Sequence, residues 1–160
     1  MLKEIKLDSN LQAINFTNLN QSDLLTILDL RNDIRVSKYM FVNRKITKKE
    51  HFKFIKNLDS TKDRIYFAIK NKNNEILGII SLTNINNLSA YIGIYKNPNL
   101  QSNGILLMQA IKYIGFKKIG LKKLFANCLQ NNHKALRFYE KTGFKKTKIK
   151  NDIVELAFEE

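Results

Sequence analysis

The chain has 160 residues, of which 44% are hydrophobic, so it can bury one core and is short for two domains. Its 28 Lys and Arg against 14 Asp and Glu give a net charge of +14, which indicates an anionic partner or a composition rich in Lys, Asn and Ile. The single Cys128 excludes an internal disulfide, the two histidines His51 and His133 exclude a Cys/His metal cluster, and every apolar run is too short to span a membrane. Since the N-terminus also lacks a signal-peptide pattern, we expect one cytoplasmic domain over residues 1–160, with no metal and no membrane partner.

The first third of the chain predicts a strand followed by two helices. Residues 11–16 form the expected strand, and Asn18 to Asn20 interrupt it. Ser22 caps an amphipathic helix that runs to Arg31. Thr47 and Glu50 then form a capping-box pattern that opens a second helix through residue 58.

From Arg64 onward the hydrophobic pattern changes from helical to alternating. It predicts three strands over residues 65–69, 76–85 and 90–95, joined by short polar turns rich in Asn. Three consecutive strands with short turns form an antiparallel meander.

The remaining segments alternate between helices and strands. We expect a helix over residues 103–119, a strand over 123–129, a helix over 131–141 and a closing hairpin of strands 144–150 and 153–158. Gly143 follows the second of these helices at the position that favours a left-handed residue. This order of elements predicts a mixed α/β or α+β layered fold.

One junction has the composition of an anion site. The strand at residues 91–95 enters a turn containing Pro98, then Gln101-Ser102-Asn103-Gly104 and a helix. A glycine and small polar residues at a helix N-terminus allow several backbone N–H groups to converge on a phosphate. The triphosphate-binding and three-glycine dinucleotide patterns are both absent, so this segment alone is compatible with a pyrophosphate site or with an ordinary connection.

A second segment narrows the interpretation. Residues Asn132 to Phe144 match the pattern Asn-x-x-Ala-x-x-x-Tyr-x-x-x-Gly-Phe, which resembles the last motif of the GNAT N-acyltransferases. Gln101 and Gly104 then resemble the pyrophosphate loop of that family, although Leu106 stands where the family usually has Gly or Ala. The resemblance covers roughly residues 64–144, with both motifs in the expected order.

The resemblance implies a fold, a co-substrate and a set of site residues. The GNAT fold has a mixed, mostly antiparallel sheet, splayed between its fourth and fifth strands and flanked by about four helices. Acetyl-CoA lies in the resulting V, and Tyr139 is implied as the general acid that protonates the CoA thiolate. The implied acetyl-CoA contacts are Ile94, Lys96 and Asn132 for the pantetheine arm and Gln101, Ser102, Asn103, Gly104 and Ile105 for the pyrophosphate.

The sequence does not supply an obvious general base. Neither of the two splayed strands, residues 90–96 and 123–129, contains a carboxylate. Asn127 occupies a plausible position but cannot take a proton, which leaves water, relayed through His51, as the expected acceptor of the proton. Cys128 suggests a covalent acyl relay, but a buried structural role is the stronger interpretation.

Within this family the chain resembles small bacterial GNAT enzymes that acetylate the 4-amino group of a UDP-linked amino-dideoxy sugar on the way to pseudaminic acid and glycosylated flagellin. Residues 30–32 with 39–40, 50–55 and 91–98 carry this likeness. It implies that the nucleotide-sugar contacts are Arg31, His51, Thr83 and Tyr95.

Two alternatives stay open at this point. One is a GNAT that acetylates a protein N-terminus or a ribosomal protein. The other is a basic nucleic-acid-binding module, in which aromatic residues such as Tyr66, Phe67, Tyr91 and Tyr95 stack on bases. The second alternative is not favoured, because it leaves the motif at residues 132–144 unexplained. The sequence leaves open whether the chain forms a homodimer.

Overall fold

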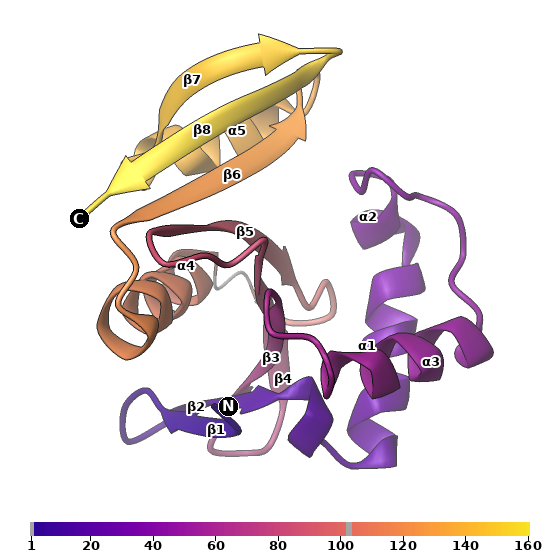
Figure 1. Ribbon diagram of the computed structural model, residues 1–160. Coiled ribbons are helices and arrows are strands. Elements are labelled where there is room, and N and C mark those ends of the chain that lie inside the picture. The colour runs from indigo at the N-terminus through magenta and orange to yellow at the C-terminus, as the bar shows by residue number, and fades with distance from the viewer. Residues whose placement is uncertain (1, 102–103) are drawn as a thin grey trace.

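A single eight-stranded sheet organises the protein, with the strand order β1-β2-β3-β4-β5-β6-β8-β7 (Figure 1). The computed structural model describes residues 2–101 and 104–160. Its strands are β1 (Glu4–Lys6), β2 (Leu11–Asn15), β3 (Ile65–Asn71), β4 (Ile76–Thr83), β5 (Ser89–Lys96), β6 (Lys123–Leu129), β7 (Lys145–Lys150) and β8 (Ile153–Glu159).

The helices flank the sheet. They are α1 (Gln21–Asn32), α2 (Ile34–Ser37), α3 (Lys48–Leu58), α4 (Gly104–Lys112) and α5 (His133–Lys141), with a 3₁₀ turn at Phe16–Asn18 and a π-helical segment at Tyr113–Ile119. Among the described residues, no helix is both long enough and apolar enough to cross a membrane.

The sheet opens between β5 and β6, as the GNAT resemblance predicts. These two strands form the parallel pair of the described sheet, and their ladder covers only Ser89–Ile92 against Lys123–Ala126. β5 continues to Lys96 and β6 to Leu129 without further pairing to each other, so the strands diverge and split the sheet into two halves (Figure 1).

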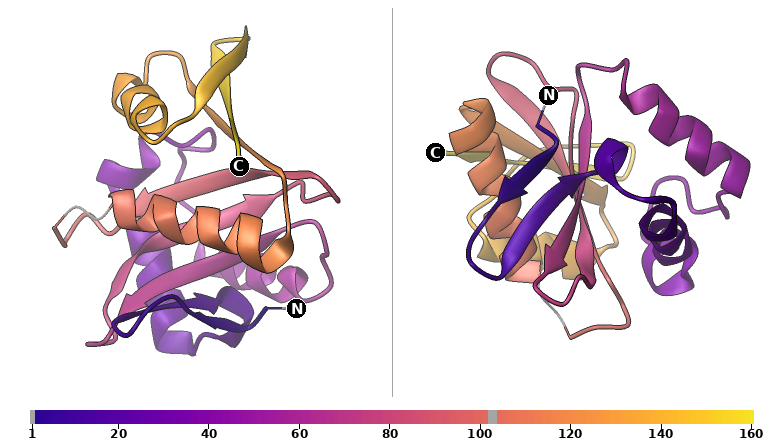
Figure 2. Two further views of the ribbon diagram at one scale, coloured as in Figure 1. Left: turned by 90° about the vertical axis from the view of Figure 1, so that its left-hand side faces the viewer. Right: turned by 90° about the horizontal axis from the view of Figure 1, so that it is seen from below.

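The two faces of the sheet carry different helices (Figure 2). α4 and α5 pack on one face, where residues such as Leu107 and Ile111 meet Phe67 and Ile80 in the larger core. α1 and α3 cover the other face, and their apolar residues pack there against Ala68 and Ile79. The split between β5 and β6 is therefore bordered by a different set of helices on each face.

Several predicted boundaries are confirmed because local chemistry fixes them. The capping box of α3 is present, with Thr47 accepting from the backbone of Glu50 and Glu50 reaching back to the Thr47 backbone. The closing hairpin turns at Asn151 and Asp152, both of which have positive φ, and Gly143 after α5 has a φ of 101°.

Other boundaries differ from the prediction. The cap of α1 is Asn20, which accepts a hydrogen bond from the backbone of Asp23, and not Ser22. β4 ends at Thr83 instead of residue 85, because Asn84 adopts a left-handed conformation. The predicted helix over residues 103–119 is α-helical only from Gly104 to Lys112 and continues as a π-helix, and Asn103 lies outside the described residues. β1 and α2, three and four residues long, were not predicted.

Candidate active site

A cleft of about 1580 Å³ runs through the opening between β5 and β6 and extends toward α1 and α3. Residues 92–96 of β5 line one wall, and Asn127 and Cys128 of β6 line the other. For clarity we call the part near α4 and α5 the cofactor half, and the part near α1 and α3 the acceptor half. The two halves bring together residues from elements that are far apart in the sequence.

The cofactor half contains most of the residues predicted to hold acetyl-CoA. Ile94, Lys96, Gly104, Ile105 and Asn132 all line it. Ile94 lies beyond the last β5–β6 pair, so this edge of β5 faces the cleft rather than a strand. This is the arrangement that an extended pantetheine arm requires for pairing with a strand.

Gly104 begins α4 at the floor of this half. A Cβ atom at this position would lie 3.2 Å from Cε1 of Phe138 and 3.8 Å from Cδ of Lys96. A side chain at this position would crowd Phe138, so glycine favours an open helix N-terminus, which suits a phosphate group. The residues present fit a CoA pyrophosphate, although Ser102 and Asn103 of the predicted loop lie outside the described residues.

Two lysines add positive charge to the same place. Lys96 lies beside Gly104, and Lys134 of α5 lies near enough for its charge to act on Lys96. Burial and then the charge of Lys134 lower the pKa of Lys96. Cations that destabilise each other in this way are stabilised when an anion lies between them.

Tyr139 projects from α5 into the cleft, where it is only 8% exposed. Burial, and then the neighbouring Cys128, raise the pKa of its phenol to about 12. The hydroxyl is therefore protonated at any working pH, as a general acid must be. α5 itself is fixed by Asn132, whose side-chain oxygen accepts from the backbone of Ala135 at 3.2 Å.

Arg31 is the central cation of the acceptor half. It stands in the last turn of α1, and its Nη2 donates to the carbonyl oxygen of Val42. Its Nη1 is buried and is the one such side-chain atom without a hydrogen-bond partner among the described residues. Burial lowers the pKa of Arg31, and the nearby Tyr95 acts in the opposite direction.

His51 and Tyr95 complete the group that the prediction placed beside Arg31. His51 of α3 is buried, and its Nε2 lies 2.7 Å from the carbonyl oxygen of Leu24. Because a carbonyl only accepts, Nε2 carries the proton, and desolvation lowers the pKa of the ring so that it stays neutral. Burial raises the pKa of the Tyr95 phenol, which is therefore also neutral.

Two predicted residues lie outside the cleft. Thr83 at the end of β4 does not line it, whereas Ser81, two residues earlier on the same face of the strand, does. Gln101 is exposed and is also absent from the lining.

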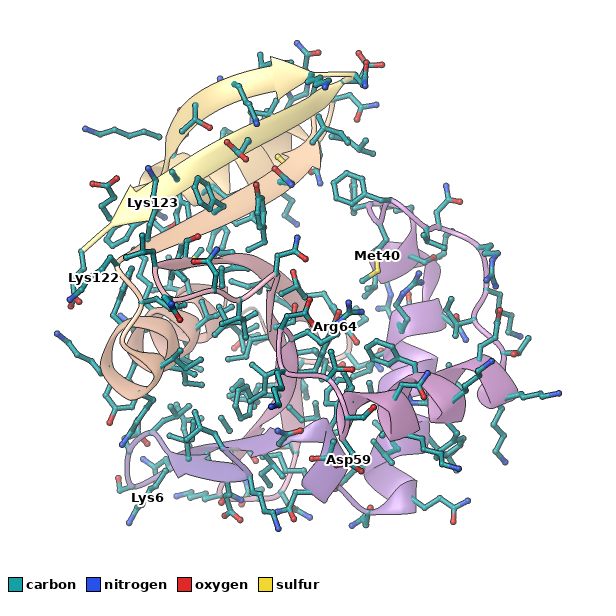
Figure 3. The ribbon with its side chains drawn as sticks, viewed as in Figure 1. Lys6, Met40, Asp59, Arg64, Lys122 and Lys123 are labelled. Carbon is teal, nitrogen blue, oxygen red and sulfur yellow. The ribbon has the colours of Figure 1, made fainter. Side chains whose placement is uncertain are left out.

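The acceptor half also contains residues that the sequence did not single out. Arg35, Lys38 and Arg44 lie in or after the short α2 and line the cleft with Tyr39 and Phe41. By contrast, Lys6, Lys122 and Lys123 lie on the side of the molecule away from α1 and α3 (Figure 3). Only part of the basic excess therefore serves the cleft.

Comparisons with known proteins agree with this geometry. The model of the acetyltransferase (GNAT) domain matches residues 14–145. The chain belongs to the GNAT acetyltransferase family. Like other GNAT enzymes it is an N-acetyltransferase that uses acetyl-CoA as the acetyl donor. Among the described residues, no three His, Cys, Asp or Glu side chains gather as metal ligands.

Individual relatives support the same assignment. This GNAT is 33% identical over 130 residues to acetyltransferase PseH of Campylobacter jejuni, which covers 81% of this chain and 82% of that protein. The crystal structure of C. jejuni N-acetyltransferase PseH in complex with acetyl coenzyme A matches with a TM-score of 0.79 and 27% identity, over 94% of this chain and 99% of that one. A spermidine N-acetyltransferase from Vibrio cholerae, in complex with CoA and spermine, has a TM-score of 0.81 at 20% identity over 95% and 96% of the two chains, which shows the common fold alone.

Proposed function

We propose that this GNAT transfers the acetyl group of acetyl-CoA to the 4-amino group of a UDP-linked amino-dideoxy sugar, a step of pseudaminic acid biosynthesis. The likeness to PseH supports this acceptor class. The observation that carries the proposal is the charge of the cleft. Among its described lining residues Glu50 is the sole carboxylate, and the cations are Arg31, Arg35, Lys38, Arg44, Lys96, Lys134 and Lys141.

The one carboxylate is neutralised by one of these cations. Glu50 forms an ion pair with Arg44 at 2.8 Å and accepts from the backbone of Thr47. Arg35 is paired with Asp33 at 2.6 Å. Arg31 and the lysines of the lining keep the cleft positively charged. A polyamine acceptor carries several positive charges and would be repelled by such a lining. A nucleoside diphosphate carries negative charges that guanidinium groups bind through paired hydrogen bonds.

The walls of the acceptor half suit the remaining parts of such a substrate. Tyr66 is packed against Phe16 at 5.5 Å and Phe54 at 5.0 Å between ring centroids, and all three line the cleft. Tyr95 adds a further ring from β5. Aromatic walls of this kind accept a planar base such as uracil. Arg31 contacts the phosphates, and the remaining ring nitrogen of His51 accepts from a sugar hydroxyl.

The chemistry proceeds by direct attack in a ternary complex. The neutral amine attacks the thioester carbonyl, the C–S bond breaks with its electron pair going to sulfur, and the sulfur takes a proton from the hydroxyl of Tyr139. The nitrogen loses one proton to a base as the amide forms. Arg31, His51 and Tyr95 hold the acceptor, while the edge of β5 and the N-terminus of α4 hold acetyl-CoA. The single buried thiol of Cys128 and two nucleotide-linked substrates fit an enzyme of the cytoplasm.

The test is an acceptor panel. Thiol release from acetyl-CoA is measured with a UDP-4-amino-4,6-dideoxy sugar, with N-terminal peptides and with spermidine. We expect release with the UDP-sugar alone. Release with peptides and none with the UDP-sugar would replace this proposal by a protein N-terminal acetyltransferase.

A further inference from the structure

A second, smaller cavity of about 250 Å³ adjoins the cleft. Its lining residues come from β5 to β8 and from the closing turn: Tyr91, Asn127, Lys148, Lys150, Asn151, Ile153 and Glu155. Asn127 also lines the main cleft, so the two cavities share this side chain. The smaller cavity thus links the point where β5 and β6 diverge to the rim of the sheet.

Glu155 of β8 gives this cavity its chemical character. It is 8% exposed and is the one buried carboxylate among the residues that the structure describes. One oxygen accepts from the Tyr91 hydroxyl at 2.7 Å, and the other accepts from Thr147 Oγ1 at 2.6 Å. Lys148 Nζ lies 4.0 Å away, so the carboxylate is held mainly by two hydroxyl groups.

The strand register places this carboxylate beside the cleft. Glu155 pairs with Asn127 on β6, and Tyr91 stands one residue before Ile92, where the β5–β6 ladder ends. The Tyr91 ring stacks on Phe125 of β6 with 5.1 Å between centroids, so its hydroxyl lines the small cavity and not the cleft. Asn127 and Tyr139 both line the cleft, so the small cavity meets the cleft at Asn127.

We propose that Glu155, acting through the Tyr91 hydroxyl and water in the small cavity, receives the proton that the acceptor amine loses in the cleft. The inference rests on the proposed function. The N–C bond forms as the C–S bond breaks, and the electron pair of that bond goes to sulfur, which is protonated by Tyr139. The amine proton passes through water beside Asn127 to the Tyr91 oxygen while the Tyr91 proton moves to Glu155, which later releases it to solvent. The carboxylate that is missing from β5 and β6 is thus supplied by β8.

The electrostatics keep both groups in the required form. Burial favours the neutral acid, but hydrogen bonds from Thr147 and Tyr91, together with Lys148 and Lys123, lower the pKa of Glu155 on balance. The same hydrogen bond raises the pKa of Tyr91. Glu155 is therefore ionised at neutral pH. Tyr91 stays protonated and donates its hydroxyl hydrogen to Glu155, so the lone pairs of the Tyr91 oxygen can accept an incoming proton. Lys150 also lines the cavity.

The test compares three variants across pH with the UDP-amino-sugar as acceptor. Glu155→Gln and Tyr91→Phe should each lower kcat about tenfold or more at pH 7, with the KM for acetyl-CoA unchanged. Their deficit should narrow as the pH rises above about 9, because solvent base then takes the proton that Glu155 would receive. Glu159→Gln neutralises an exposed carboxylate of the same strand, outside the small cavity, and should stay within about twofold of wild type with an unaltered pH profile.

Each result bears on the inference. Wild-type kcat in both Glu155→Gln and Tyr91→Phe overturns it, as does a loss in these two variants that is the same at every pH, which would make Glu155 structural. If Glu155→Gln does not fold, the comparison of Tyr91→Phe with Glu159→Gln decides. If the wild-type protein ignores the UDP-sugar, the proposed function fails, and the three variants are compared on the amine that it does acetylate.

Discussion

Arg31, in the last turn of α1, donates a hydrogen bond from Nη2 to the carbonyl oxygen of Val42 in the loop between α2 and α3. The same loop is tied to α1 a second time, since Asn32 exchanges two hydrogen bonds of 2.8 Å with the backbone of Ile46. One side of the guanidinium is therefore used to position the rim of the cleft. The other side, at the buried Nη1, has a donor left for an anionic ligand.

Replacing Arg31 should separate the two substrates. Charge-assisted hydrogen bonds contribute about 1.5–3 kcal/mol, so Arg31→Ala should raise the acceptor KM roughly 10- to 100-fold and leave the KM for acetyl-CoA nearly unchanged. Steady-state kinetics with each substrate varied in turn measures this. Arg31→Lys should recover only part of the loss, because an ammonium lacks the paired donors.

Lys122→Ala is the matched control for the loss of one positive charge. Lys122 lies away from α1 and α3, at the start of β6 (Figure 3), and its removal should leave both KM values unchanged. An equal rise in the acceptor KM in both variants would show that net charge, rather than Arg31 itself, attracts the acceptor.

Replacing Gly104 should show whether acetyl-CoA binds at the start of α4. A ligand at about 100 times its Kd stabilises the folded state by about 2.7 kcal/mol, which corresponds to roughly 5–10 °C in Tm for a chain of this size. Gly104→Glu fills the space beside Phe138 and adds a negative charge, so it should abolish this shift. Ile149→Glu, which adds the same charge at a 55% exposed position of β7, should keep it. A full shift in Gly104→Glu contradicts the assignment of the pyrophosphate site.

Tyr139→Phe should affect turnover and not binding. The ring still packs in the core, so the Tm shift with acetyl-CoA should stay, while kcat falls about tenfold or more through the loss of the hydroxyl. Because burial raises the pKa of Tyr139 to about 12, the wild-type rate should show no decline from its deprotonation up to about pH 10. Equal kcat values in the two proteins at every pH would mean that the thiolate leaves without this proton.

A buried ion pair should make a measurable contribution to stability. Lys70 of β3 has a side chain that is 3% exposed, and its Nζ lies 2.6 Å from Asp23 at the start of α1. Lys70→Ala leaves the partly buried Asp23 carboxylate without its cation, so the free energy of unfolding should fall by about 2 kcal/mol. Urea titration measures this loss. Arg64→Ala breaks an exposed pair with Asp63 and should lower the free energy of unfolding by under about 1 kcal/mol in the same measurement. Similar losses in the two variants would contradict this account.

The fold was predictable where local patterns carry enough signal. The capping box at Thr47, the positive-φ turn of the closing hairpin and Gly143 after α5 each fix a boundary within a few residues. β1 and α2 were missed because three- and four-residue elements have no periodicity of their own. They exist because the sheet edge and α1 stabilise them.

The site was predictable only where a motif marks it. Tyr139, Asn132 and Gly104 belong to contiguous patterns, and all three line the cleft. The contact between Tyr91 and Glu155 joins residues 64 positions apart, and no local pattern connects them. It follows from the order of β5, β6 and β8 in the sheet, which only the structure supplies.

The most direct measurement of the central claim is the acetylated product itself. The purified protein is incubated with acetyl-CoA and an equimolar mixture of a UDP-4-amino-4,6-dideoxy sugar, an N-terminal peptide and spermidine, and the products are identified by mass spectrometry. The cationic, aromatic cleft predicts a single product, the UDP-sugar carrying one additional acetyl group on its 4-amine. Acetylated peptide or acetylated spermidine beside an unmodified UDP-sugar would contradict it.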